Sequence, residues 1–205
     1  MRAAVLGSPI AHSRSPQLHL AAYRELGLTD WTYDRIECTG EQLPGLVGGF
    51  GPEWVGVSVT MPGKFAALRF ATERTQRAEL VGSANTLVRV DGGWRADNTD
   101  VDGVVGALGE VSGAAAVLGS GGTAPAAVVA LASLGITDVA VVARNASKAG
   151  ALVELGERLG VATRWVALGE KLNSLGVVVN TLPATVAGEF SGTVADTAVL
   201  LDAIY

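Results

Sequence analysis

The chain has 205 residues, enough for one large domain or two small ones. Hydrophobic residues make up 49% and charged residues 17%, so we expect a buried core and exclude disorder. A net charge of −5 and only 5% aromatic residues argue against nucleic-acid binding, which needs a basic face or stacking platforms. The single cysteine, Cys38, excludes an intrachain disulfide and favours a reducing compartment. The opening apolar run is too short for a signal peptide, so we expect a cytoplasmic chain.

One apolar stretch tests this expectation. Residues 111–137 contain no Asp, Glu, Lys or Arg, which is long enough to span a bilayer. The sequence GSGGTAP interrupts the stretch at 119–125, and no Lys/Arg cluster flanks it. We therefore expect a buried strand, a glycine turn and a buried helix there, and no membrane partner.

Short apolar runs in the first half of the chain predict strands. They are RAAVLG (2–7), TYDRIEC (32–38), VGVSVT (55–60) and NTLVRV (85–90). Ser15 is expected to cap a helix that has Pro16 at its first position and ends at Gly27. Residues 91–93, Asp-Gly-Gly, favour a hairpin that returns through residues 94–96.

The second half shows a more regular alternation. A helical pattern from 103 to 113 loosens at its glycines, and we place the domains at 1–103 and 104–205. The further strands are predicted at 114–119, 138–144, 162–167, 176–180 and 198–202, with helices ending near 134 and 159. Strands that alternate with helices predict an α/β fold with a parallel sheet.

Residues 119–124 (Gly-Ser-Gly-Gly-Thr-Ala) fit the pattern G-x-G-x-x-G/A after a strand and before a helix. In that context the first glycine permits a tight turn and the second lets backbone approach a pyrophosphate. The helix that follows offers free N–H groups to phosphate. A glycine turn without a ligand is the alternative.

The end of the next strand bears on the choice of nucleotide. An NAD-binding unit usually places Asp or Glu there to hold the ribose 2′-hydroxyl. This chain has Ala143, Arg144 and Asn145 instead, with Lys148 one turn on. A guanidinium can pair with a 2′-phosphate, which favours NADP. The alternative is a solvated arginine.

The first half carries polar residues at the ends of its elements. Ser13 and Ser15 are two hydroxyls that could bind one carboxylate, although a helix cap is the default for Ser15. The segment VSVTMPGK puts Thr60 at a strand end and Lys64 on the first turn of a helix. Asn85 and Asp100 add an amide and a carboxylate, with a turn residue and a helix cap as alternatives. His12 and His19 are expected to be loop and helix-surface residues, not metal ligands, so we expect no metal.

Five ordered motifs, S-R-S-P, V-T-M-P-G-K, G-S-A-N-T, D-N-T-D and the glycine turn, together resemble the shikimate dehydrogenases from Gly7 to Tyr205. The segments GSGGTAPAAV and VVARN are most similar to the mycobacterial type. The resemblance implies an N-terminal α/β substrate-binding and catalytic domain followed by a Rossmann-like NADP-binding domain. It also implies NADP-dependent interconversion of 3-dehydroshikimate and shikimate, in the synthesis of chorismate and the aromatic amino acids.

The resemblance also implies roles for particular residues. Lys64 and Asp100 would be the catalytic pair. The residues implied to bind substrate are Ser13, Ser15, Thr60, Lys64, Asn85, Asp100 and Tyr205. The residues implied to bind the cofactor are Gly119, Ser120, Gly121, Gly122, Thr123, Ala143, Arg144, Asn145, Ala146, Ser147, Lys148, Gln76 and Ala203.

The chain departs from the pattern at Leu20, Ser58, Ala143 and Asn145, where relatives commonly have Asn, Asn, Asn and Thr. Relatives also continue beyond Tyr205 with a helical segment that carries a substrate-binding Gln, so we expect a sequence or an active site that is incomplete. Two alternatives stay open: quinate or NAD as ligands of the same fold, or a non-catalytic ligand sensor. We expect a monomer or a homodimer that acts on a small molecule.

Overall fold

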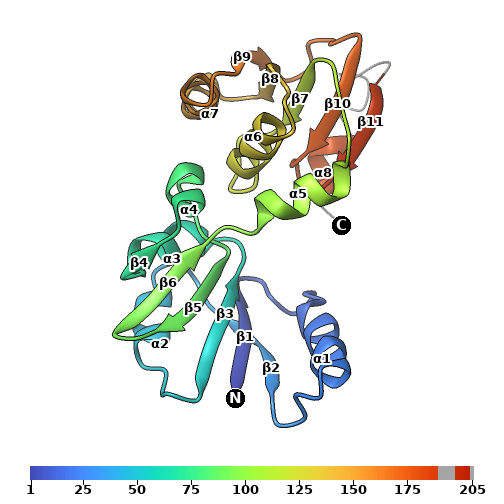
Figure 1. The fold of residues 1–205 in the computed structure, drawn as a ribbon. Coiled ribbons are helices and arrows are strands. Elements are labelled where there is room, and N and C mark those ends of the chain that lie inside the picture. The colour runs from blue at the N-terminus through green and yellow to red at the C-terminus, as the bar shows by residue number, and fades with distance from the viewer. Residues whose placement is uncertain (189–196, 204–205) are drawn as a thin grey trace. The chain divides into compact units, whose positions relative to one another are not determined.

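The computed structural model describes residues 1–188 and 197–203, and the chain divides into two compact units, residues 1–99 and 100–205 (Figure 1). The second unit opens with helix α5 (Asp100–Leu108), so this division falls four residues before the sequence-based boundary at 103/104. Both units combine strands and helices, as the α/β prediction requires.

The first unit is built on a six-stranded sheet in the order β2-β1-β3-β5-β6-β4. Its strands are β1 (Arg2–Gly7), β2 (Thr32–Glu37), β3 (Trp54–Val59), β4 (Glu73–Arg74), β5 (Thr86–Val90) and β6 (Gly93–Asp97). Strand β1 runs parallel to β2 and β3, whereas β5 runs antiparallel to β3 and β6. The β5–β6 pair confirms the hairpin predicted at residues 91–93, and each strand predicted in this half begins and ends within one residue of an observed strand.

Helices cover both faces of this sheet. They are α1 (Ser15–Glu25), α2 (Leu43–Gly48), α3 (Lys64–Phe70) and α4 (Gln76–Val81). Because side chains alternate along β1, Val5 packs with Leu20 of α1 on one face, and Leu6 packs with α2 and α3 residues on the other. The prediction of Ser15 as the helix cap is wrong: Arg14 occupies the cap and Ser15 is the first helical residue. The hydroxyl of Ser13 accepts the Ser15 N–H at 3.3 Å, so the residue before the cap satisfies this free donor.

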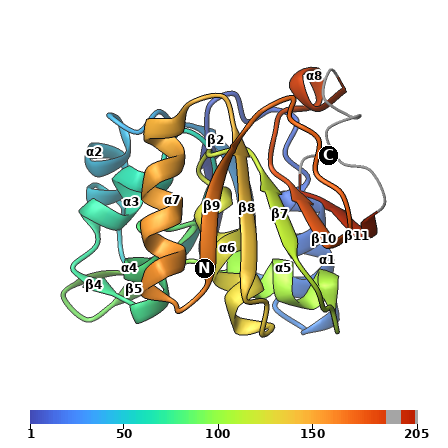
Figure 2. The ribbon, with the colours of Figure 1, turned by 90° about the horizontal axis from the view of Figure 1, so that it is seen from above.

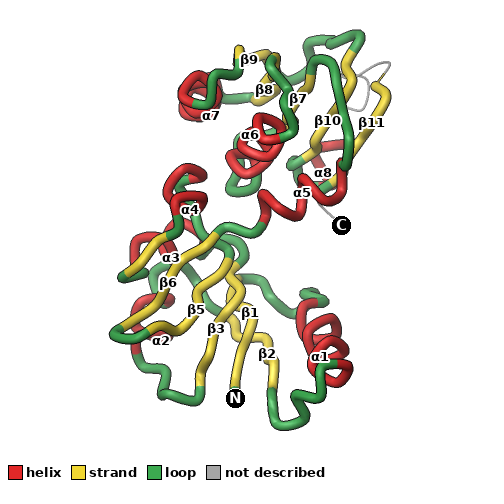
Figure 3. The backbone as a smooth tube through the Cα atoms, in the orientation of Figure 1, coloured by secondary structure: helices red, strands yellow, loops and turns green. Residues whose placement is uncertain are grey.

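The second unit has an all-parallel sheet in the order β11-β10-β7-β8-β9 (Figures 2 and 3). Its strands are β7 (Ala115–Leu118), β8 (Asp138–Ala143), β9 (Ala162–Ala167), β10 (Leu175–Asn180) and β11 (Thr197–Asp202). This order is that of a dinucleotide-binding Rossmann unit, with the chain reversing direction beside the first strand. The parallel sheet predicted for the second domain is therefore confirmed, and every strand bound agrees within one residue.

Helices α5, α6 (Ala124–Ser133) and α7 (Ala146–Arg158) pack in sequence against one face of the second sheet, and α8 (Ala184–Ala187) packs against the core of the other. Most residues of α6 are fully buried, which explains why it is apolar on nearly all sides. The uncharged stretch 111–137 thus forms β7, a glycine turn and α6, as predicted. Within the described part of the chain, no helix is long and apolar enough to cross a membrane.

Candidate functional site

The loop between β1 and α1 brings the two predicted carboxylate-binding serines together. The Ser13 hydroxyl donates to Ser15 Oγ at 3.2 Å, and only 7% of Ser13 is exposed. The turn is closed by the Ser13 N–H, which donates to Ile10 O at 3.0 Å. Two adjacent hydroxyls can rotate to donate to the two oxygens of one carboxylate.

The segment after β3 delivers Thr60 and Lys64. Thr60 follows the last residue of the strand, and its carbonyl accepts the Gly63 N–H at 2.9 Å, which closes a tight turn. Gly63 caps α3, so Lys64 is the first residue of that helix. Gly7, at the end of β1, allows the approach of this turn, since a Cβ there would overlap the methyl group of Thr60.

Asn85 lies at the same edge of the sheet, because β5 is antiparallel to β3. Its carbonyl accepts the Val59 N–H at 2.7 Å, and the neighbouring Ala84 N–H donates to Lys64 O at 3.0 Å. The Asn85 amide oxygen accepts the Thr99 N–H at 2.9 Å, and its amide nitrogen donates to Thr99 Oγ1 at 3.1 Å. Asn85 is therefore fixed beside Thr60 and Lys64, and it holds the residue that precedes Asp100.

An ion pair that the sequence did not reveal anchors α4, the helix that begins with the exposed Gln76. Arg77 Nη2 lies 2.6 Å from Asp97 Oδ2, and the Thr75 hydroxyl donates to Asp97 Oδ1 at 2.7 Å. Burial by itself raises the pKa of Asp97, but hydrogen bonds from Arg77, Thr75 and the Asn98 N–H together lower it below its usual value. The carboxylate of Asp97 is thus kept charged and ties α4 to β6.

The glycine turn of the second unit has the conformation that its sequence predicts. Gly119 has φ of +106°, and a Cβ there would lie 2.6 Å from Thr181 Oγ1. A Cβ on Gly121 would meet nothing within 4 Å, so the backbone there faces open space. Thr123 caps α6, and Ala124 is fully buried where the helix meets the sheet. The turn therefore leaves a helix N-terminus open to a ligand.

The segment after β8 exposes the two predicted phosphate-binding cations. Arg144 and Lys148 are both exposed, and no Asp or Glu occurs among residues 143–148. Asn145 caps α7, with its amide oxygen accepting the Lys148 N–H at 3.0 Å. Trp165, which the sequence did not single out, donates its indole N–H to Ala143 O at 2.9 Å and so holds the start of this segment.

Ala203 lies at the C-terminal end of the second sheet. The Ala203 N–H donates to Asn180 O at 2.9 Å, which places Ala203 directly after β11. Tyr205, which the resemblance implies as a substrate-binding residue, lies outside the described residues.

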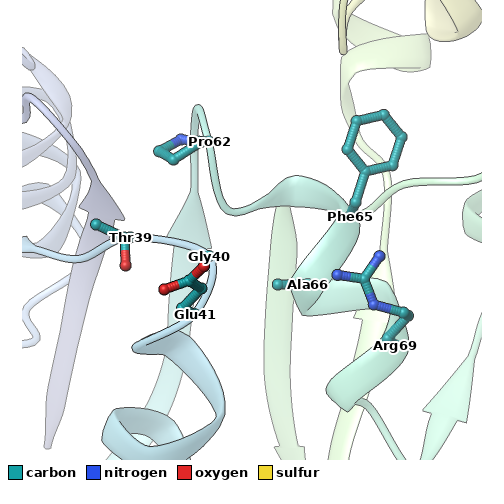
Figure 4. A pocket seen from close by; sticks show the side chains of 7 residues that line it. All are labelled: Thr39, Gly40, Glu41, Pro62, Phe65, Ala66 and Arg69. Atoms are coloured by element: carbon teal, nitrogen blue, oxygen red, sulfur yellow. The ribbon is translucent and has the colours of Figure 1, made fainter.

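The first unit also has a pocket of about 670 Å³ that none of the predicted residues lines (Figure 4). Phe65, Ala66 and Arg69 contribute to it from α3, and the segment 39–41 closes it after β2. The pocket therefore shares α3 with Lys64 but is lined by other residues of that helix.

Comparison with known proteins identifies the family. Residues 5–87 match the shikimate dehydrogenase substrate binding domain. A curated shikimate dehydrogenase (NADP(+)) of Methylobacterium radiotolerans is 38% identical over 202 residues, which cover 92% of this chain and 70% of that protein. Other curated relatives match only 51 to 56% of this chain, and these matches span 7 to 41% of the relatives' own length.

Solved structures extend the likeness to the whole chain. The shikimate dehydrogenase of Mycobacterium tuberculosis is 68% identical with a TM-score of 0.93, over 100% of this chain and 79% of that one. The shikimate 5-dehydrogenase of Thermus thermophilus, solved with NADP(H) and shikimate, is 34% identical with a TM-score of 0.77, over 89% of this chain and 68% of that one. The resemblance seen in the motifs is confirmed, and the chain belongs to the shikimate dehydrogenase family.

Proposed function

We propose that this chain catalyses the NADP-dependent, reversible reduction of 3-dehydroshikimate to shikimate, a step in the synthesis of chorismate and the aromatic amino acids. The observation that carries the proposal is the gathering of Thr60, Lys64 and Asn85 at one edge of the first sheet. Family membership supplies the substrate class, since the relatives that match are named for this reaction.

In this proposal the serine pair binds the substrate carboxylate. Ser13 and Ser15 already lie 3.2 Å apart, so two neutral donors are positioned before substrate arrives. Preorganised donors reduce the ordering that binding would otherwise require. Thr60 and Asn85 would then hold the ring hydroxyls, which fixes the substrate at the sheet edge that carries Lys64.

Lys64 is assigned the proton transfer. Reduction of a ketone adds a hydride to carbon and a proton to oxygen, and negative charge develops on that oxygen in the transition state. An ammonium group at the first position of α3 can stabilise this charge and then donate the proton. Asp100, the other residue of the implied catalytic pair, would orient a substrate hydroxyl.

The residues of the second unit fit NADP. The left-handed Gly119, the open backbone at Gly121 and the buried Ala124 form a turn that a pyrophosphate can approach. Arg144 and Lys148 would hold the 2′-phosphate, with no carboxylate nearby to accept from a 2′-hydroxyl. The bound cofactor would supply the hydride, and the chain supplies position and charge.

The proposal includes the setting of the enzyme: a cytoplasmic monomer or homodimer that acts on a small molecule. The single cysteine, which is buried, supports a reducing compartment such as the cytoplasm. Light scattering would distinguish monomer from dimer.

An absorbance assay at the nicotinamide band tests the proposed function. Shikimate or quinate would be paired with NADP or NAD, and the largest kcat/KM is expected for shikimate with NADP. A higher value for quinate or for NAD would overturn the choice of substrate or cofactor. Calorimetric binding of shikimate without turnover in any combination would identify a ligand sensor instead.

A further inference from the structure

The loop of residues 8–14, which carries Ser13, is held by side chains of the neighbouring strand β2. Tyr33, Arg35 and Glu37 occupy alternate positions of this strand, so their side chains share one face. We call these three residues the β2 ladder.

Glu37 holds the beginning of the loop. Its two carboxylate oxygens accept from the Ser8 hydroxyl at 2.6 Å and from the Ile10 N–H at 3.1 Å. A carboxylate accepts strongly from such donors, and here it replaces the backbone partners that a loop residue lacks. The first half of the loop is thereby fixed to β2.

Arg35 holds the loop at the serine itself. Its Nε donates to Ser13 O at 2.7 Å, and its Nη2 donates to Gln17 Oε1 at 2.9 Å. One planar guanidinium thus joins Ser13 to α1, the helix that contains Ser15. A lysine would keep the positive charge but could not reproduce this pair of directed donors.

Tyr33 is the buried member of the ladder, and it lies beside the serine pair. The side chain is only 4% exposed, its hydroxyl donates to Ser58 Oγ at 2.7 Å, and its ring stacks on His19 with centroids 4.0 Å apart. Burial raises the pKa of Tyr33 to about 12, although hydrogen bonds with Ser58 and Ser15 act in the opposite direction. The phenol therefore remains neutral and serves as a hydrogen-bonding group, not as an acid or base.

We propose that the β2 ladder is a positioning device that sets the affinity of the serine pair for the substrate carboxylate, with Arg35 as its principal member. This inference rests on the proposed function. The ladder contacts the loop, α1 and, through Tyr33, Ser15 itself, so its effect passes through Ser13 and Ser15. Its removal should weaken substrate binding and spare the proton transfer assigned to Lys64.

Steady-state kinetics with Arg35→Lys, Arg35→Ala and Glu37→Gln test the proposal. Both Arg35 variants should raise the KM for shikimate about tenfold while kcat changes less than about twofold. The lysine variant should behave like the alanine variant, because both lose the two directed hydrogen bonds of the guanidinium even though lysine keeps the charge. Glu37→Gln keeps one acceptor and should raise the KM about threefold. Arg24→Ala, an exposed arginine in the last turn of α1, is the matched control and should leave the KM unchanged.

A substrate without the carboxylate sharpens the test. With the methyl ester of shikimate, the ester should bind weakly to every variant, and the difference between wild type and Arg35→Lys should disappear. Full activity in Arg35→Lys would show that charge suffices and would overturn the inference, as would a lowered thermal midpoint with an unchanged KM. A wild type without shikimate–NADP activity would instead overturn the proposed function, and it would do so before any variant is compared.

Discussion

The two units form their binding sites by different means. In the first unit, side chains fix the site: Glu37 and Arg35 hold the serine loop, and Asn85 holds Thr99. At the glycine turn of the second unit, backbone groups fix the conformation: the Gly119 N–H donates to Val142 O and the Thr181 N–H to Leu118 O, each at 2.8 Å. One site therefore depends on many directed polar contacts, and the other depends on glycine and close packing.

The difference follows from what each unit would bind. A pyrophosphate is recognised by N–H groups that nearly every residue has, so backbone conformation is the main requirement. A polyhydroxy acid carries donors and acceptors in fixed directions, so particular side chains have to be held in place. Substitutions in the first unit should therefore change chemistry and substrate affinity, whereas those in the second should change nucleotide binding.

The largest expected effect is that of Lys64→Ala. Lys64 is the proposed general acid/base, and its loss should lower kcat by roughly 10²- to 10⁴-fold. Because the nucleotide would be bound by the second unit in the proposed function, the affinity for NADP measured by calorimetry should stay the same. Lys171→Ala, an exposed lysine of the second unit, serves as the control and should have wild-type kinetics. Turnover close to that of the wild type in Lys64→Ala would remove the lysine from the mechanism.

Gly119→Ala should be the most damaging change in the second unit. A Cβ would be strained at φ of +106° and would also press against Thr181 Oγ1, 2.6 Å away. We expect the free energy of unfolding to fall by about 3 kcal/mol, with a weaker affinity for NADP. Urea denaturation and calorimetry would measure the two effects.

The matched control for Gly119 is Gly135→Ala. Gly135 also has a positive φ, +82°, but a Cβ there would meet nothing within 4 Å. This variant should lose only the backbone contribution, about 1 to 2 kcal/mol, and should bind NADP normally. Equal losses for the two glycines would show that the turn at Gly119 tolerates a methyl group.

The same contrast explains what the sequence could predict. The glycine turn is encoded within six consecutive residues, and the apolar runs located every strand except the two-residue β4 to within one residue. Helices α2 and α4 have only six residues each, too short to show a helical period, and were missed. The β2 ladder was missed because Arg35 and Glu37 contact residues 22 and 29 positions earlier, which requires knowledge of how β2 pairs with β1.

The dependence of the first unit on charged side chains predicts a sensitivity to acid. Asp97 has a lowered pKa in the folded chain, so its contribution is present above the unfolded pKa and is lost as the pH falls through the folded pKa. Asp97→Asn should therefore lower the free energy of unfolding by about 2 kcal/mol at pH 7, and the difference should shrink below about pH 4. Urea denaturation at several pH values would measure it.

Asp34→Asn is the control for this pH dependence. The Arg2–Asp34 pair is about half exposed, at 48% and 49%, against 29% and 24% for the Arg77–Asp97 pair. An exposed pair contributes at most about 1 kcal/mol, so Asp34→Asn should have little effect at any pH. Hydrogen exchange should show faster opening of α4 and β6 in Asp97→Asn with the second unit unchanged, and uniform opening of both units would contradict the assignment.

The smallest effect, about tenfold in affinity, is expected at Arg144. A contact between this exposed guanidinium and a 2′-phosphate should make NADP bind about ten times more tightly than NAD, the lower end for a charge-assisted hydrogen bond. Arg144→Ala should lower the affinity for NADP by about that factor. It should leave the affinity for NAD unchanged, because NAD carries no 2′-phosphate. Arg158→Ala, an exposed arginine at the other end of α7, controls for a general loss of positive charge on that helix.

The backbone around Arg144 should keep its conformation in Arg144→Ala. The Asn145 side chain caps α7 on one side of it, and the Trp165 indole N–H holds Ala143 O on the other. The loss of NADP affinity should therefore be electrostatic. Its size should then fall as salt is added. If the wild type binds NAD as tightly as NADP in calorimetry, Arg144 is a solvated surface residue, and the second unit selects its nucleotide by other means.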